Sequence, residues 1–114
     1  MVKRNRLKKR LVDVNRVFGG RIINEGNLDF ETEMASIQKQ PFKRASHLTR
    51  AMTSGHSFSD GNKRTAIVAV TSEMRDAGFK VDKKKLVRIM IKLSKIGEGN
   101  LKKIESNLRR CMKK

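Results

Sequence analysis

The chain has 114 residues and carries 28 Lys and Arg against 11 Asp and Glu, a formal net charge of +17. This length fits one domain, so we expect a single domain over residues 1–114. No run approaches the roughly 18 apolar residues of a membrane span, and the basic N-terminus lacks the apolar segment of a secretory signal. Together with the lone Cys111, which fits a reducing compartment, these features predict a cytoplasmic protein that does not enter a membrane.

Apolar spacing predicts helices in the first 40 residues, interrupted by one extended segment. The first helix stops at Gly19-Gly20, and its apolar residues recur at helical spacing (Leu7, Leu11, Val14 and Phe18). The segment from Arg21 to Asn27 is β-branched at Ile22 and Ile23 and then turns over residues 24–27, which predicts a short extended flap. A second, weaker helix is expected before Pro41, with Phe30, Met34 and Ile37 on its apolar face.

The remaining residues predict four more helices. One runs from Phe42 to Thr53 and stops at Ser54-Gly55, and the strongest spans residues 63–77, with Gly78 as its C-terminal cap. Asp82 is expected to cap the next helix, and residues 97–100 form a turn before the last one, whose apolar face carries Leu101, Ile104 and Leu108. The patterns predict an all-α fold, a compact helical bundle with a short β-like flap, in which residues 63–77 form the central buried helix.

The loop before the central helix combines features that suit a phosphate. Asn62 is a good helix cap, so the N–H groups that follow it lack intrahelical partners. Lys63 and Arg64 lie at the same positive end of the helix dipole, where cations are disfavoured by about 0.3–1 kcal/mol each. Gly61 lets the backbone approach a ligand closely. N–H donors, a dipole and two cations therefore predict a bound anion.

Three further residues of this loop complete the chemistry of phosphoryl transfer. His56 can accept a proton near neutral pH and could activate a hydroxyl. Asp60 is a hard oxygen ligand suited to Mg²⁺ held jointly with nucleotide phosphates. Phe58 can bury itself as the anchor of the loop. Each residue alone is more often structural, but their joint occurrence within nine residues favours a catalytic site.

The segment from His56 to Ala66, HSFSDGNKRTA, resembles the motif of the Fic/Doc family, in particular its Doc (death-on-curing) branch. The resemblance covers nearly the whole chain. Ala45–Leu48 resembles the helix before the loop, and Asp76–Phe79 resembles the end of the central helix. Gly19-Gly20 and the residues from Glu25 to Leu28 resemble the entry and the flap.

This resemblance implies a role for each residue of the loop. His56 would be the general base, and Asp60 would bind Mg²⁺. Gly61, Asn62 and Lys63 would form the phosphate-binding nest, and Arg64 would counter phosphate charge. The flap over residues 22–27 would hold a segment of the target protein by strand pairing. Family members use ATP or another nucleotide, commonly to transfer AMP.

The Doc branch instead implies a kinase that phosphorylates a translation factor and acts as a toxin paired with an antitoxin protein. Two departures from the AMP-transferring pattern favour this branch. Lys63 replaces a Gly, and Ile67, which cannot contact phosphate, replaces a second Arg. The resemblance therefore implies a protein-modifying phosphotransferase, with an AMP-transferring enzyme as the alternative.

Other readings of the sequence stay open. The charge is compatible with a non-catalytic nucleic-acid-binding helical domain, although neither a helix-turn-helix nor a zinc-binding pattern supports it. A second alternative is a family member that binds nucleotide without transferring anything. The residues from Ser94 to Gly99 fit a loose inhibitory pattern of the family, but Glu98 falls in a predicted turn where a helix is needed. His47 is expected to be a core or rim residue.

Overall fold

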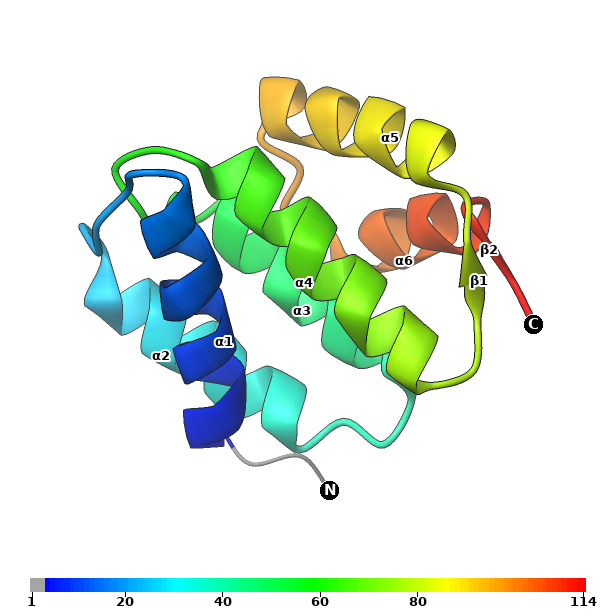
Figure 1. Ribbon diagram of the computed structural model, residues 1–114, viewed down its shortest axis with the longest axis horizontal. Coiled ribbons are helices and arrows are strands. Elements are labelled where there is room, and N and C mark those ends of the chain that lie inside the picture. The colour runs from blue at the N-terminus through cyan, green and yellow to red at the C-terminus, as the bar shows by residue number, and fades with distance from the viewer. Residues whose placement is uncertain (1–3) are drawn as a thin grey trace.

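The computed structural model describes residues 4–114, which form six helices and two short strands packed into one compact unit (Figure 1). The elements follow in the order α1 (Arg4–Val17), α2 (Glu25–Ser36), α3 (Pro41–Thr53), α4 (Asn62–Asp76), β1 (Lys80–Val81), α5 (Lys83–Ile96), α6 (Leu101–Arg109) and β2 (Met112–Lys113). The predicted all-α fold is therefore confirmed.

Helices α3 and α4 form the centre of the bundle (Figure 1). Helix α4 contacts α1, α3 and α5, while α3 contacts α2, α4, α5 and α6. The inward face of α4 is fully buried at Ala66, Ala69, Val70 and Met74. Burial of this face removes apolar surface from water on several sides at once, which stabilises the helix independently of its intrinsic propensity. The prediction that residues 63–77 form the central buried helix is confirmed.

Most predicted helix ends are also confirmed. Helix α3 begins at Pro41, as the fixed φ of proline allows, and ends at Thr53, with Ser54 as its C-cap. The side chain of Asp82 accepts a hydrogen bond from the N–H of Lys85 and caps α5, and Asn100 caps α6 in the same way. Each cap satisfies one backbone donor that the first turn of its helix leaves without an intrahelical acceptor.

The predicted turn at residues 24–27 and the predicted face of the second helix are wrong. Asn24 accepts a hydrogen bond from the N–H of Asn27 and so caps α2, which starts at Glu25. The inward face consists of Leu28, Glu31, Thr32, Ala35 and Ser36, whereas Phe30 and Ile37 are 54% and 53% exposed. The buried side of α2 is largely polar, so apolar spacing alone assigned the wrong face.

The flap is shorter than predicted. Backbone pairing with the loop before α4 is limited to residues 21–24, where Ile22 forms an isolated antiparallel bridge with Phe58. The antiparallel pair of β1 and β2, which matches Lys80 with Lys113 and Val81 with Met112, was not predicted. Among residues 4–114, no helix is both long and apolar enough to cross a membrane.

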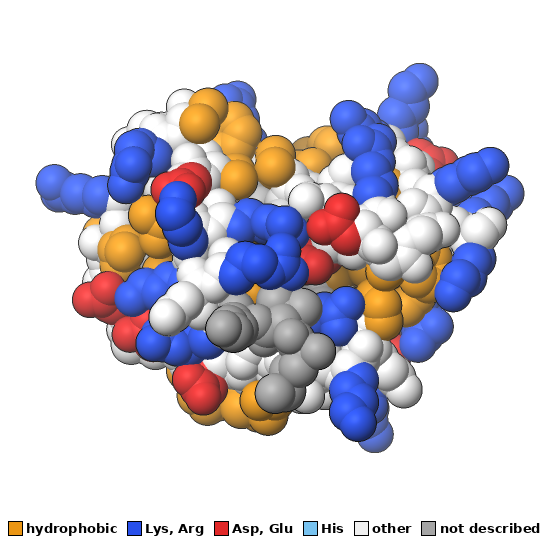
Figure 2. All heavy atoms as spheres, turned by 60° about the horizontal axis from the view of Figure 1, so that its bottom comes forward, with side chains coloured by type: hydrophobic (Ala, Val, Ile, Leu, Met, Phe, Trp, Pro, Cys, Tyr) orange, Lys and Arg blue, Asp and Glu red, His pale blue; other side chains and the backbone are white. Residues whose placement is uncertain are grey.

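Charged side chains cover much of the surface. Figure 2 shows Lys and Arg spread over the face turned forward, with Asp and Glu among them at its left and centre. The basic cluster of α1 lies in this mixed environment, because Arg4, Lys8 and Arg10 form ion pairs with acidic residues of α2 and α4. The positive charge of α1 is thus largely balanced within the fold.

Candidate functional site

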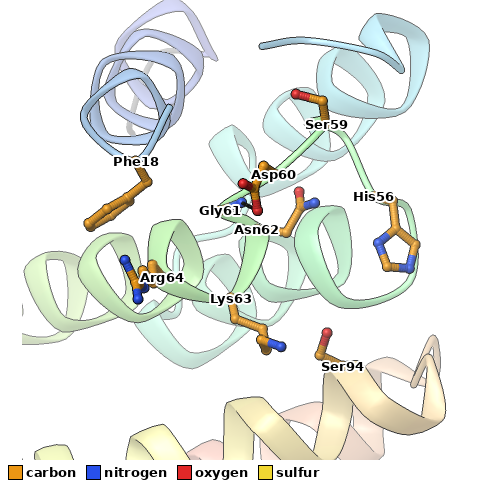
Figure 3. A pocket seen from close by; sticks show the side chains of 9 residues that line it. All are labelled: Phe18, His56, Ser59, Asp60, Gly61, Asn62, Lys63, Arg64 and Ser94. Atoms are coloured by element: carbon orange, nitrogen blue, oxygen red, sulfur yellow. Dashed lines mark hydrogen bonds between the residues drawn. The ribbon is translucent and has the colours of Figure 1, made fainter. Parts of the chain in front are cut away.

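A pocket of about 400 Å³ opens at the start of α4 (Figure 3). All six residues that the sequence singled out border it, together with residues from the end of α1 and from α5. The lining consists of Phe18, His56, Ser59, Asp60, Gly61, Asn62, Lys63, Arg64 and Ser94. The fold therefore gathers the predicted residues around one cavity, and it adds Phe18, Ser59 and Ser94 to them.

The loop from His56 to Gly61 is fixed by its own residues. Phe58 is 1% exposed and anchors the loop in the core, as predicted. The side-chain amide of Asn62 forms two hydrogen bonds with the backbone of Phe58, accepting from its N–H at 3.2 Å and donating to its carbonyl at 2.8 Å. Asn62 is thus the first residue of α4 and a brace for the loop, and its prediction as the N-cap is wrong.

Gly61 is the N-cap of α4, and no side chain caps this helix. Its φ of 72° is left-handed, and a Cβ atom there would lie 2.9 Å from Cβ of Phe18. The N–H groups of the first turn are therefore left without side-chain acceptors beside the pocket. Lys63 and Arg64 leave the same turn, where the dipole is positive, and both are exposed. Donors, dipole and cations therefore come together at one end of the pocket, the combination from which the sequence predicts an anion site.

Figure 3 shows how the lining side chains are distributed around the pocket. Arg64 lies on the same side as Phe18, with its guanidinium carbon 5.8 Å from the centre of the phenyl ring. Lys63 points toward α5, where Ser94 lies, and His56 lies on the side away from Phe18. The cationic groups are therefore spread over the pocket, and the imidazole stands at one end.

Asp60 borders the pocket and is held there by hydrogen bonds to its side chain and to its carbonyl. Its Oδ1 accepts a hydrogen bond from the N–H of Gly61 at 2.8 Å. Its carbonyl accepts one from Nδ2 of Asn15 at 2.7 Å, and the same amide donates to Oγ1 of Thr65 at 3.1 Å. Asn15 thus ties α1 to the loop and to the first turn of α4. Sequence reasoning missed it, although it follows Leu7 and Leu11 at intervals of four residues on the inward face of α1.

Gly20 allows this close approach. A Cβ atom at Gly20 would lie 2.3 Å from Oδ1 of Asn15 and 2.4 Å from the carbonyl oxygen of Asp60. These separations are far below an ordinary contact, so the position has room for hydrogen alone. The Gly19-Gly20 pair therefore does more than stop a helix, because its second residue sets how tightly the loop packs on α1.

His56 has an unusual backbone conformation. Its φ is 43°, the one positive value at a non-glycine residue between residues 4 and 114. The left-handed region costs a non-glycine residue roughly 1–2 kcal/mol, and such strain tends to occur at functional sites. The side chain is exposed at the edge of the pocket, where a substrate hydroxyl can reach it.

The extended flap pairs with the loop through one of its edges. The N–H of Ile23 donates to the carbonyl of Ser57 at 2.9 Å, and the N–H of Ser59 donates to the carbonyl of Arg21 at 2.8 Å. These bonds flank the bridge between Ile22 and Phe58, so the peptide groups of Ile22 face away from the loop. The flap therefore offers an outer edge to an added strand.

His47 lies in the core, as predicted, and takes no part in the pocket. Its Nδ1 is 3.0 Å from Oε1 of Glu31, and Arg50 donates to both oxygens of the same carboxylate. Burial raises the pKa of Glu31, but the hydrogen bonds from His47 and Arg50 outweigh it, so the pKa lies below the ordinary value. The network joins α2 to α3 and is structural.

Glu98 lies in the turn between α5 and α6, as expected, where its carboxylate accepts a hydrogen bond from the N–H of Asn100 at 3.2 Å. It does not border the pocket, although Ser94 does. The Glu of the loose inhibitory pattern at residues 94–99 therefore lies in a turn and not on a helix.

The residues present suit a metal shared with a ligand rather than a metal held by protein alone. No group of three or more His, Cys, Asp or Glu side chains comes together within residues 4–114. Asp60 supplies a single exposed carboxylate next to the anion site. Mg²⁺ commonly takes one or two carboxylates and completes its shell with phosphate oxygens and water. The donor set is thus compatible with Mg²⁺ that arrives with a nucleotide.

A comparison with protein-family models matches residues 6–73, more than half of the chain, to the Fic/DOC family. The chain belongs to the Fic/DOC family. The match runs from α1 through most of α4 and includes the flap and the whole pocket loop. Fic/DOC proteins bind nucleotides and transfer nucleotide-derived groups to other proteins. A search among curated proteins gave no match.

Proposed function

We propose that this Fic/DOC protein is a Doc-like phosphotransferase, which moves the γ-phosphate of ATP to a hydroxyl of a target protein. One observation carries the proposal. The uncapped N-terminus of α4, with Lys63 and Arg64 in its first turn, shares a pocket with His56. An anion site beside a group that can accept a proton is what phosphoryl transfer to a hydroxyl needs.

The residues divide the work between binding and proton transfer. The backbone N–H groups after Gly61 and the side chains of Lys63 and Arg64 bind the phosphates. Asn62 keeps the loop in place through its two bonds to Phe58. His56 acts as the general base, and its exposed position at the pocket edge leaves room for the incoming hydroxyl. General-base catalysis of this kind contributes about 10²–10⁴-fold to a rate.

The transfer step balances without a further reactant. The hydroxyl oxygen of the target forms a bond to the γ-phosphorus, and its proton passes to the imidazole of His56. The bond between the γ-phosphorus and the bridging oxygen breaks, and ADP leaves with the electron pair. His56 then returns its proton to solvent. In-line attack requires the γ-phosphate to be the group next to His56.

We further propose that Asp60 holds Mg²⁺ together with the nucleotide. Bound Mg²⁺ would neutralise charge that develops on the phosphate oxygens. The protein's part is to present a carboxylate whose position is fixed by the bond from Gly61 and by the tie between Asn15 and the Asp60 carbonyl.

Two positions support phosphate transfer over AMP transfer. Lys63 adds a cation that a Gly at this position would not supply. Ile67 is partly buried and borders the groove between α4 and α5, outside the pocket, so this position adds no cation to the phosphate site. The positive charge of the pocket thus lies near Asp60, and the pocket lacks a second arginine. This arrangement favours a nucleotide that presents its γ-phosphate to His56.

The flap suits a protein target. The outward peptide groups of Ile22 can pair with an extended segment of the target, and main-chain pairing brings a hydroxyl side chain to the pocket without requiring a particular sequence. From the resemblance to the Doc branch we also propose a translation factor as the target and an antitoxin protein as a partner. The protein would then act in the cytoplasm as a single-domain toxin.

Intact-mass spectrometry of a modified target tests the proposal. Incubation of a lysate with labelled ATP and Mg²⁺ should label a protein, whose mass should rise by about 80 Da, and His56→Ala should remove the label. Lys43→Ala is a control, because Lys43 is an exposed cation of α3 outside the pocket lining. An adduct of about 329 Da that depends on His56 marks AMP and overturns the kinase assignment. Unchanged labelling by His56→Ala overturns the role of the imidazole.

A further inference from the structure

Helix α5 carries positive charge that the fold does not balance. Its 14 residues include six Lys and Arg and no Asp or Glu. None of the ion pairs formed between residues 4 and 114 involves an α5 cation, whereas α1 engages Arg4, Arg6, Lys8, Lys9 and Arg10 in such pairs. The two basic helices therefore differ: most cations of α1 form ion pairs within the fold, whereas those of α5 face solvent.

The cations of α5 line up on one face. Leu86, Met90 and Leu93 define the buried side of the helix. With 100° per residue, the opposite side carries Lys84, Arg88, Lys92 and Lys95, which we call the α5 ridge. All four are exposed. Steps of three or four residues advance about 4.5–6 Å along the axis, so the ridge is a row of closely spaced charges.

We propose that the α5 ridge binds the phosphate backbone of a nucleic-acid duplex without reading its sequence. A row of unpaired cations on one exposed helix face matches a linear array of phosphates and gains free energy through release of counterions. Helix α5 has no aromatic residue on which bases could stack, so contacts to the backbone are favoured over single-strand binding.

One apolar residue lies among the cations of the ridge. Val87 and Ile91 are 39% and 50% exposed; Val87 borders a groove with Ile67 and Val68, whereas Ile91 falls on the ridge side of the helix. Four cations against one apolar side chain make charge the main attraction of this face. A phosphate backbone, which needs no apolar contact, suits such a face better than a protein partner does.

The ridge also lies close to the pocket. Ser94, which borders the pocket, directly precedes Lys95 of the ridge. Helix α5 therefore presents one flank to the nucleotide site and its outer face to a polyanion. A nucleic acid on the ridge would hold the enzyme at a nucleoprotein particle and raise the local concentration of protein targets bound there.

Fluorescence anisotropy of a short labelled duplex, titrated between about 50 and 200 mM NaCl, tests the proposal. The ridge variant is Lys84→Gln with Lys95→Gln. The matched control is Lys39→Gln with Lys43→Gln, which removes the same charge from two exposed lysines. These lysines belong to the connection between α2 and α3 and to the first turn of α3, and this connection lies at the bottom of Figure 1, whereas α5 lies at the top. Each lost phosphate contact lowers the salt slope of log K by about 0.9, so the ridge variant should lose about 1.8 and the control nearly nothing.

Three results overturn the proposal. They are the absence of duplex binding by the wild type at low salt, equal slopes for the two variants, and displacement of the duplex by polyglutamate of equal charge as readily as by unlabelled duplex. The third result assigns the ridge to an acidic protein. Thermal unfolding checks that both variants fold. The ridge variant should also keep the His56-dependent transfer activity, so failure of this proposal is distinct from failure of the proposed function.

Discussion

The contact between Gly20 and the pocket loop gives the sharpest test of how the site is held. In Gly20→Ala the new methyl group would start 2.3 Å from Oδ1 of Asn15 and 2.4 Å from the carbonyl of Asp60, against 3.4–4 Å for an ordinary contact. The loop must therefore move away from α1 by about 1 Å, and a misplacement of this size can cost about 10²-fold in rate. Overpacking of this kind costs about 1–3 kcal/mol of stability.

The matched control is Gly26→Ala in the first turn of α2. The nearest atom to its new Cβ would be Oδ1 of Asn24 at 3.9 Å, so the methyl group fits without displacement. Alanine is also the better helix former by about 1 kcal/mol, so this variant should be at least as stable as the wild type.

Two measurements compare the variants. Transfer from labelled ATP should fall about 100-fold in Gly20→Ala and stay unchanged in Gly26→Ala. Thermal unfolding should place Gly20→Ala roughly 4–12 °C below the wild type. If both alanine variants transfer at the same rate, the packing of Gly20 does not position Asp60, and the reasoning fails.

Three further predictions follow from other parts of the fold. His56→Gly should unfold at a higher temperature than His56→Ala, because glycine relieves the strain of the positive φ, and both should lose transfer activity by about 10²–10⁴-fold. The pKa of Glu31 is held below its ordinary value of 4.5 in the folded protein, so its bonds to His47 and Arg50 stabilise the fold above that pH and are lost as the pH falls through the folded pKa. Unfolding temperatures between about pH 3 and 7 should therefore fall more steeply on the acid side for the wild type than for Glu31→Gln, and parallel curves would contradict this account. Burial raises the pKa of Cys111 to about 11, so a thiol reagent at neutral pH should label it slowly in the native protein and rapidly after denaturation, and fast native labelling would refute its burial.

Sequence reasoning predicted the helices well where an apolar face decides the packing. Ala66, Val70 and Met74 in α4 and Leu86, Met90 and Leu93 in α5 follow the helical period, and all six are buried. Helix α2 broke this pattern because its buried face carries Glu31 and Thr32, whose polar atoms find partners only in the folded state. Apolar Phe30 and Ile37 then pointed to the wrong side.

The pocket shows the same division between local and distant information. His56, Asp60 and the residues from Gly61 to Arg64 all lie within nine consecutive positions, so the loop motif could place them together before any fold was known. Asn15 lies 45 residues away from its partner Asp60, and neither composition nor spacing joins the two. Asn62 was assigned as a cap because its type suits a cap, yet its amide braces Phe58, a choice that the geometry of the turn makes.

The two hydrogen bonds between the Asn62 amide and the backbone of Phe58 have a consequence for the energetics of substrate binding. A loop that is braced by Asn62, tied through Asp60 to Asn15 and anchored by a buried phenyl ring has little conformational freedom left to lose when the substrates bind. Ordering of the loop therefore adds little unfavourable entropy to the activation barrier. Because this geometry exists before a nucleotide or a target protein arrives, a molecule that fills the pocket can bind without first ordering the loop.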